Sequence, residues 1–140
     1  MKGVVFMTAI KDIEGIGDLF TKKLHAIGIN TVESLLEKGS SKKGRDDIAK
    51  EAGIDEHKIL EWVNRADLYR IKGIGSEYSD LLEAAGVDTV VELSKRRPDN
   101  LTEKMVEVNI EKRLVRRVPT QQMVERWINE AKSLPRIVTY

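Results

Sequence analysis

Two short stretches decide the fold of this chain. Ile13-Glu14-Gly15-Ile16-Gly17 recurs 58 residues later as Ile71-Lys72-Gly73-Ile74-Gly75. In each stretch the first glycine allows a tight turn with a positive φ angle, and the second leaves backbone N–H groups unobstructed. We expect the isoleucine between the glycines, Ile16 or Ile74, to be buried. Each stretch therefore predicts a tight turn that leads directly into a helix.

The repetition extends beyond these turns. At the same offset, identical residues are Leu24 and Leu82, Ala26 and Ala84, Gly28 and Gly86, Thr31-Val32 and Thr89-Val90, and Leu35 and Leu93. Trp62-Val63-Asn64 matches Trp127-Ile128-Asn129 at an offset of 65, so the second copy has seven additional residues. The sequence therefore predicts two tandem copies of one unit of about sixty residues. The predicted division is an N-terminal extension over 1–12, units over 13–70 and 71–134, and a tail over 135–140.

Glycine and threonine positions predict where helices end and begin. Gly28 and Gly86 stand where a helix ends in the left-handed conformation, which glycine adopts without steric cost. Thr31 and Thr89 are expected to begin the next helix as N-caps. Only the second copy has an acidic capping-box partner three residues later, at Glu92.

Apolar spacing and capping signals predict the remaining elements. The expected elements are a loop over 39–44, a helix over 45–52, a helix capped by Asp55, a helix over 101–108, a helix that begins after Pro119-Thr120, and short extended segments over 4–7 and 136–140. The prediction is an all-α fold in which two units pack as one compact helical body with short extended termini.

Composition excludes several classes of protein. The chain has 140 residues, of which 41% are hydrophobic and 34% charged, and it has no cysteine. This composition is typical of globular proteins, and it excludes disulfides, thiol nucleophiles, iron–sulfur clusters and thiolate zinc sites. His25 and His57 are isolated, and the sequence contains no catalytic or nucleotide-binding motif. We therefore expect a protein that is not an enzyme and needs no metal or cofactor.

The length of the apolar runs predicts location. No run is long enough to span a bilayer or to form the core of a signal peptide. We therefore expect a cytoplasmic protein that does not bind membranes.

Positive charge is concentrated in one segment. The formal net charge is +1, from 24 basic and 23 acidic residues. Residues 95–117 contain eight of the bases and four of the acids, a local charge of +4. The bases expected to extend a track along a phosphate backbone are Lys95, Arg96, Arg97, Lys112, Arg113, Arg116 and Arg117. The alternative is a solvated surface on which interleaved carboxylates balance these bases.

Each glycine turn also predicts an anion site. Where a turn ends at a helix N-terminus, free N–H groups and partial positive charge attract a phosphate. The nearby bases are Lys22, Lys23, Arg70 and Lys72. Asp18 and Glu77 place carboxylates at the same helix starts, where they would stabilise the helix and repel a phosphate. Phosphate binding and a purely structural role are therefore the two alternatives for these turns.

The arrangement resembles the helix-hairpin-helix family. The family pattern is present twice, as Gly15-Ile16-Gly17, Thr21, Leu24, Gly28 and Thr31-Val32, and as Gly73-Ile74-Gly75, Ser79, Leu82, Gly86 and Thr89-Val90. Over residues 13 to about 134, the chain further resembles an uncharacterised family of tandem helix-hairpin-helix proteins, a domain of unknown function. The resemblance implies an all-α fold built from two such repeats.

The resemblance also implies a function. Family members bind nucleic acid, DNA rather than RNA, without sequence preference, through hairpin N–H groups on phosphates and nearby lysine or arginine. It would also allow a monovalent cation at the hairpin carbonyl groups. The second hypothesis is a protein-interaction scaffold, or an accessory subunit, in which the glycine turns only join helices closely. The residues do not predict an oligomeric state.

Overall fold

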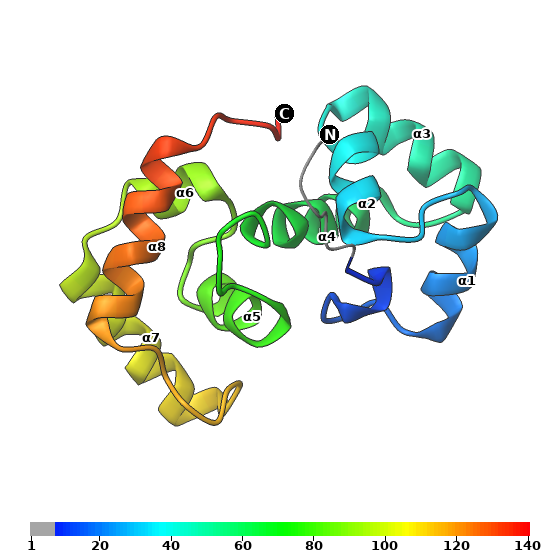
Figure 1. Ribbon diagram of the computed structural model, residues 1–140. Coiled ribbons are helices and arrows are strands. Elements are labelled where there is room, and N and C mark those ends of the chain that lie inside the picture. The colour runs from blue at the N-terminus through cyan, green and yellow to red at the C-terminus, as the bar shows by residue number, and fades with distance from the viewer. Residues whose placement is uncertain (1–7) are drawn as a thin grey trace, which may run out of the picture. The chain divides into compact units, whose positions relative to one another are not determined.

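The computed structural model describes residues 8–140, whose secondary structure is helical, with no strand (Figure 1). The elements are η1 (Ile10–Asp12), α1 (Asp18–Ala26), α2 (Val32–Gly39), α3 (Lys42–Ala52), α4 (Glu56–Leu68), α5 (Ser76–Ala84), α6 (Val90–Ser94), α7 (Pro98–Lys112) and α8 (Gln121–Ser133). The all-α prediction is therefore confirmed. Of the two segments expected to be extended, 4–7 lies outside the described residues, and 136–140 forms neither helix nor strand.

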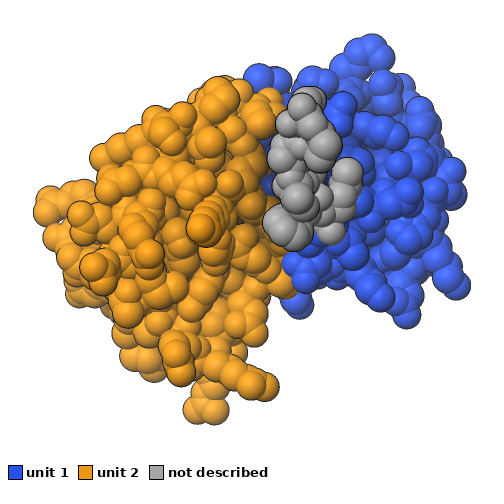
Figure 2. Space-filling model, viewed as in Figure 1, with its two compact units in different colours: residues 1–66, 138–140 blue, residues 67–137 orange. Residues whose placement is uncertain are grey.

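The chain divides into two compact units (Figure 2). Unit 1 consists of the residues up to Ala66 together with Val138–Tyr140, and unit 2 consists of Asp67–Ile137. The division falls inside α4, between Ala66 and Asp67. The boundary expected from the sequence lies four residues later, between 70 and 71.

The expected loop over 39–44 is wrong, because two helices occupy most of it. Helix α2 includes Gly39, and α3 already begins at Lys42 after the N-cap Ser41, whose Oγ accepts the N–H of Gly44 at 3.0 Å. A Cβ on Gly44 would collide with the carbonyl oxygen of Lys38, and a Cβ on Gly39 would stand 2.5 Å from a methyl of Val63. These glycines therefore permit close helix packing and do not form a loop.

A buried arginine attaches the C-terminal residues to unit 1. Arg45 is 3% exposed, and its Nη1 donates to the carbonyl oxygens of Gly39 and Ser40 at 2.9 and 3.1 Å. Its Nη2 donates to the carbonyl oxygen of Thr139 at 2.7 Å, and the Tyr140 ring lies 5.7 Å from the guanidinium. The guanidinium thus satisfies carbonyl groups at the end of α2 and in the tail at once.

Threonines begin α2 and α6, as predicted. Thr31 Oγ1 accepts the N–H of Ser34 at 3.0 Å, and Thr89 Oγ1 accepts the N–H of Glu92 at 3.2 Å. The reciprocal bond of a capping box was expected from Glu92, and this expectation is wrong. It forms instead in unit 1, where Ser34 Oγ accepts the N–H of Thr31 at 3.2 Å. The Glu92 carboxylate pairs with Arg96 at 3.2 Å, which explains the difference.

The core of unit 2 lies among α5, α6, α7 and α8, with α8 packed against α6 and α7. Helix α7 is longer than the expected 101–108 at both ends. It starts earlier because Pro98 stands at the first helical position, where its missing N–H has no intrahelical partner to lose, and it continues to Lys112. Helix α8 begins after Thr120, as expected, and Thr120 Oγ1 accepts the N–H of Met123 at 3.1 Å.

A buried carboxylate organises the beginning of unit 2. Asp67 is 2% exposed, and its Oδ2 accepts the N–H of Val90, the first residue of α6, at 2.9 Å. Its Oδ1 accepts from Nη1 of Arg70 at 2.9 Å, and Nη2 of Arg70 donates to the carbonyl oxygen of Pro135 at 2.7 Å. The Asp67–Arg70 pair therefore joins the end of α4, the start of α6 and the segment after α8.

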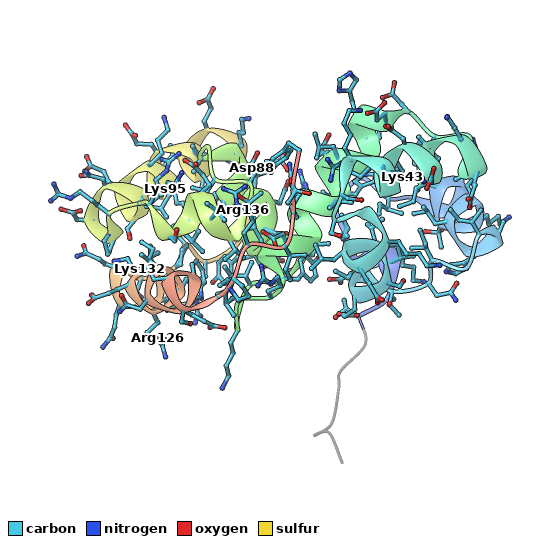
Figure 3. All side chains as sticks on the ribbon, turned by 90° about the horizontal axis from the view of Figure 1, so that it is seen from above. Lys43, Asp88, Lys95, Arg126, Lys132 and Arg136 are labelled. Atoms are coloured by element: carbon cyan, nitrogen blue, oxygen red, sulfur yellow. The ribbon has the colours of Figure 1, made fainter. Side chains whose placement is uncertain are left out.

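Near this pair, Asp88 is exposed to solvent, but its carboxyl is partly desolvated by the surrounding residues, and this raises the pKa of the carboxyl above its ordinary value of 3.8 (Figure 3). A hydrogen bond from its own backbone N–H opposes this rise, and the negative charges of Glu92 and Asp67 add to it. Because the folded state holds the proton more tightly than the unfolded chain, stability is lost as the pH rises from 3.8 through the raised pKa. At pH 7, where the Asp88 carboxyl is ionised, the free energy of unfolding is therefore lowered by the full amount of this effect.

We expect Asp88→Asn to raise the free energy of unfolding at pH 7 by roughly a few tenths of a kcal/mol, since partly exposed charges interact weakly. Asn30 lies 58 residues before Asp88, at the same offset that separates the two glycine turns. Urea titrations at pH 7 and at about pH 4 measure the effect, and the advantage should shrink at the lower pH as the wild-type carboxyl becomes protonated. A variant less stable than the wild type at pH 7 would show that the ionised Asp88 carboxylate does not destabilise the fold.

Candidate functional site

The two glycine turns, residues 15–17 and 73–75, have the same backbone geometry. Gly15 and Gly73 have φ angles of 95° and 94°. Ile16 and Ile74 are each 4% exposed, and their N–H groups donate to the carbonyl oxygens three residues earlier at 3.1 Å in both turns. The expected positive φ angles and buried isoleucines are therefore confirmed.

A tryptophan of the same unit lies against each turn. A Cβ on Gly15 would lie 3.5 Å from Nε1 of Trp62, and a Cβ on Gly73 would lie 3.3 Å from Nε1 of Trp127. Each tryptophan also packs on a ring of the helix that follows the turn. The ring centroids of Phe20 and Trp62 are 5.0 Å apart, and those of Tyr78 and Trp127 are 5.1 Å apart. The packing thus fixes where each turn meets its helix.

The helix starts after both turns lack a side-chain cap. Helices α1 and α5 follow Gly17 and Gly75, and no side chain among the described residues accepts a hydrogen bond from their first-turn N–H groups. Asp18 and Glu77 are exposed and do not occupy these donors. The first turns of α1 and α5 therefore keep the donors that an anion would use.

The four bases expected beside the turns differ in their surroundings. Lys22 and Lys72 have exposed side chains. Lys23 is half-buried, and its Nζ lies 3.4 Å from the carbonyl oxygen of Gly53 at the end of α3. The Arg70 guanidinium is bound to Asp67 and Pro135. Of these four bases, each turn therefore keeps one exposed lysine, and Arg70 has a structural role.

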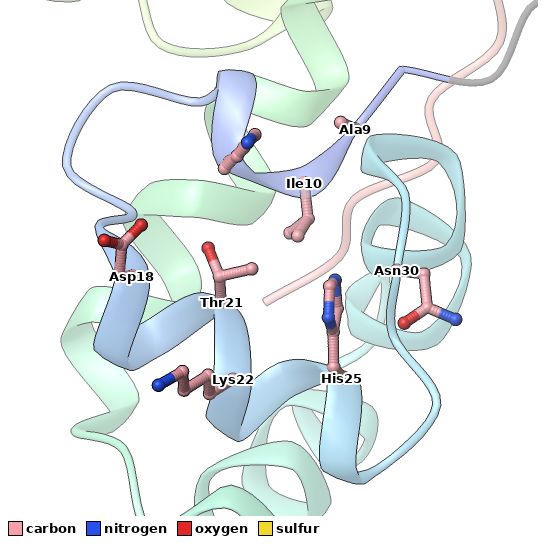
Figure 4. Close-up of a pocket in the computed structure, with 8 residues that line it drawn as sticks. Ala9, Ile10, Asp18, Thr21, Lys22, His25 and Asn30 are labelled. Carbon is pink, nitrogen blue, oxygen red and sulfur yellow. The ribbon is translucent and has the colours of Figure 1, made fainter.

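A cavity of about 430 Å³ lies beside the first turn, between η1 and α1 (Figure 4). The polar face of α1 that lines it consists of Asp18, Thr21, Lys22 and His25, and Lys11 and Asn30 complete the lining. The Thr21 hydroxyl is buried there without a hydrogen-bond partner among the described residues. The cavity therefore combines two lysines and a carboxylate with an unpaired hydroxyl.

A second cavity, of about 420 Å³, lies beside the second turn and is lined by Lys72, Gly73, Arg126, Trp127 and Glu130, among others. The Glu130 carboxylate accepts the N–H of Lys72 at 3.2 Å. Arg126 lies on α8 and is exposed (Figure 3). Arg126 is not among the residues predicted from the sequence, although its position one residue before Trp127 would have placed it near the turn.

The basic segment is split into two parts. In the first, Nη2 of Arg96 donates to the carbonyl oxygen of Gly86 at 2.9 Å, and Arg97 pairs with Asp99 at 3.2 Å; Lys95, which follows α6, is exposed. In the second, Lys112 ends α7, and Arg113, Arg116 and Arg117 lie exposed in the loop that follows. The second part thus presents its charges without these local pairings.

Residues 8–140 contain neither a cluster of metal-ligating side chains nor a helix that could span a membrane. No group of three or more histidine or carboxylate side chains there is placed to hold a metal ion. None of the helices there is both long enough and apolar enough to span a membrane.

Comparison with protein families gives a match over most of the chain. The model described as Domain of unknown function (DUF4332) matches residues 14–134. The chain belongs to this family. The DUF4332 match includes both glycine turns, both tryptophans and the basic segment. Neither the curated proteins nor the solved structures gave a match.

Proposed function

We propose that this DUF4332 chain is a tandem helix-hairpin-helix protein that binds nucleic-acid backbones, DNA rather than RNA, without sequence preference. The observation that carries this proposal is the pair of uncapped helix starts behind the glycine turns. Backbone N–H groups at such a start bind a phosphate oxygen, and lysine or arginine adds charge. Because these contacts do not read base edges, they carry no sequence information.

The surrounding charges favour modest affinity. At the first turn, Lys11 and Lys22 line the cavity with Asp18. At the second turn, Lys72 and Arg126 line the cavity with Glu130. In both places bases outnumber carboxylates, but the carboxylates offset part of their attraction for a phosphate. We expect dissociation constants of about 10⁻⁶ to 10⁻⁴ M at physiological salt, the range of non-specific binding.

The combined Lys22→Glu and Lys72→Glu variant is expected to bind labelled duplex DNA about tenfold more weakly or worse, because each turn loses its exposed lysine. Fluorescence anisotropy with duplex and single-stranded DNA at two salt concentrations measures this. For the wild type, log affinity should fall against log salt by about 0.9 per phosphate contacted on duplex DNA.

The matched control is the combined Lys43→Glu and Lys104→Glu variant. It changes the net charge by the same amount as the test variant, but its substitutions lie on α3 and α7. It should bind within about twofold of the wild type, because neither lysine belongs to a turn. If wild-type binding is absent at low salt, or if both double variants lose affinity equally, the turns are not the binding elements.

Helix α7 supports the second candidate function, a protein-interaction scaffold. Its Ile110 is 74% exposed, and Val106 stands one helical turn earlier with 37% exposure. Exposed apolar residues on one helix face favour a protein partner. A chain that binds no DNA but co-purifies with a specific protein, and loses it on Ile110→Asp, would support the scaffold.

A further inference from the structure

The connection before the last helix differs between the two units. In unit 1, only residues 53–55 separate α3 from α4. In unit 2, residues 113–120 separate α7 from α8, and we call this segment the basic loop. The basic loop contains Arg113, Arg116 and Arg117, and Lys112 directly precedes it. The longer connection is therefore also the more basic one.

An α7 side chain and the core of unit 2 contact the backbone and the central valine of the basic loop. The Asn109 side chain accepts the N–H of Val115 through Oδ1 at 2.9 Å and donates to its carbonyl oxygen through Nδ2 at 3.0 Å. Val115 is itself buried. Arg113 has φ 51° and ψ 47°, a left-handed conformation that residues with a Cβ rarely adopt. The loop backbone is thus anchored at its centre.

Tyr78 attaches the other end of the basic loop to the second turn. Its hydroxyl donates to the carbonyl oxygen of Arg117 at 3.1 Å, and its ring packs on Trp127, which lies against Gly73. The first copy has Phe20 at the corresponding position, with the same packing on Trp62 but no hydroxyl. The hydroxyl of Tyr78 is therefore found in unit 2, which is also the unit that has the long basic loop.

The charged side chains of this segment face solvent. Lys112, Arg113, Arg116 and Arg117 are exposed, and over residues 8–140 none of them forms an ion pair. Four bases within six residues, on a backbone that is already ordered, bind successive phosphates with little loss of backbone entropy. Such a surface is complementary to a polyanion with regularly spaced charges.

We infer that the basic loop and the second glycine turn form one binding surface for successive phosphates of a nucleic-acid backbone, and that Tyr78 positions the loop on it. This inference rests on the proposed function. Tyr78 acts as a positioning residue, because its hydroxyl binds the loop backbone and leaves the phosphates to the turn N–H groups and the bases. Unit 2 is then the main binding unit.

The test compares Tyr78→Phe with the wild type. Phenylalanine keeps the ring packing, as Phe20 does in unit 1, so the urea midpoint should change little. Amide hydrogen exchange at Val115, whose N–H is bonded to Asn109 within the loop, should accelerate in the absence of DNA, and affinity for duplex DNA should fall about three- to tenfold, the equivalent of one hydrogen bond. Tyr140→Phe is the matched control, since its hydroxyl contacts Asn64 in unit 1, and it should leave both readouts unchanged.

A second variant, Arg116→Glu combined with Arg117→Glu, tests the surface itself and should weaken binding about tenfold or more. No binding by the wild type at low salt overturns the proposed function and this inference together. Wild-type binding with unchanged affinity in the double variant overturns the inference alone. Weakened binding in the double variant with wild-type exchange and affinity in Tyr78→Phe overturns the role of Tyr78.

Discussion

The Asp67→Ala variant should lose about 3 to 5 kcal/mol of unfolding free energy. Asp67 is the partner of both Arg70 and the N–H of Val90, each at 2.9 Å. Without the carboxylate, the largely buried guanidinium of Arg70 keeps, among the described residues, only its bond to Pro135, and the N–H of Val90 in the interior loses its acceptor. Urea denaturation followed by circular dichroism at 222 nm measures the loss.

Asp99→Ala provides the control for this prediction. Asp99 pairs with Arg97 at 3.2 Å, but both side chains are half-exposed or more, so the pair contributes less than about 1 kcal/mol. A loss for Asp67→Ala no larger than that for Asp99→Ala would show that the buried pair does not hold unit 2 together.

The Gly44→Ala variant is expected to destabilise the chain by about 2 kcal/mol or more. Alanine in place of a helical glycine ordinarily stabilises by about 1 kcal/mol, so the direction of the change is informative. At Gly44 the added methyl would collide with the carbonyl oxygen of Lys38, and backbone atoms cannot move aside cheaply. Helices α2 and α3 would have to separate. The urea midpoint measures the result.

Gly17→Ala is the matched control, because it adds the same methyl group where nothing lies within 4 Å of it. Its φ angle of −87° is also accessible to alanine. We expect a change below about 1 kcal/mol. If Gly44→Ala is as mild as Gly17→Ala, the close approach of α2 and α3 is not essential to unit 1.

Local signals predicted much of this fold. The glycine turns, the N-caps Thr31, Thr89 and Thr120, and the helix end at Gly53 depend on residues close in sequence, so their chemistry is readable without a structure. The prediction of a loop over 39–44 was wrong because the structure there depends on residues that are distant in sequence. Whether a glycine breaks a helix or admits a neighbouring helix depends on what packs against it, and Val63 lies far along the chain.

In the candidate site, too, the sequence predicts local features but not the contacts between residues that are distant in the chain. The sequence identified Lys22 and Lys72 as bases near the turns, and both are exposed. It could not show that the guanidinium of Arg70 is held by Pro135, 65 residues away, or that Arg126 lines the cavity at the second turn. Charge can be counted in a sequence, but whether a charge is available depends on tertiary contacts.

The aromatic packing at the turns also gives each unit its own optical reporter. The chain has two tryptophans, Trp62 in unit 1 and Trp127 in unit 2, and each is almost fully buried beside its turn. Indole emission shifts to longer wavelength when the ring reaches water. Emission recorded from one indole at a time would therefore reveal whether the halves of the molecule melt together or in sequence.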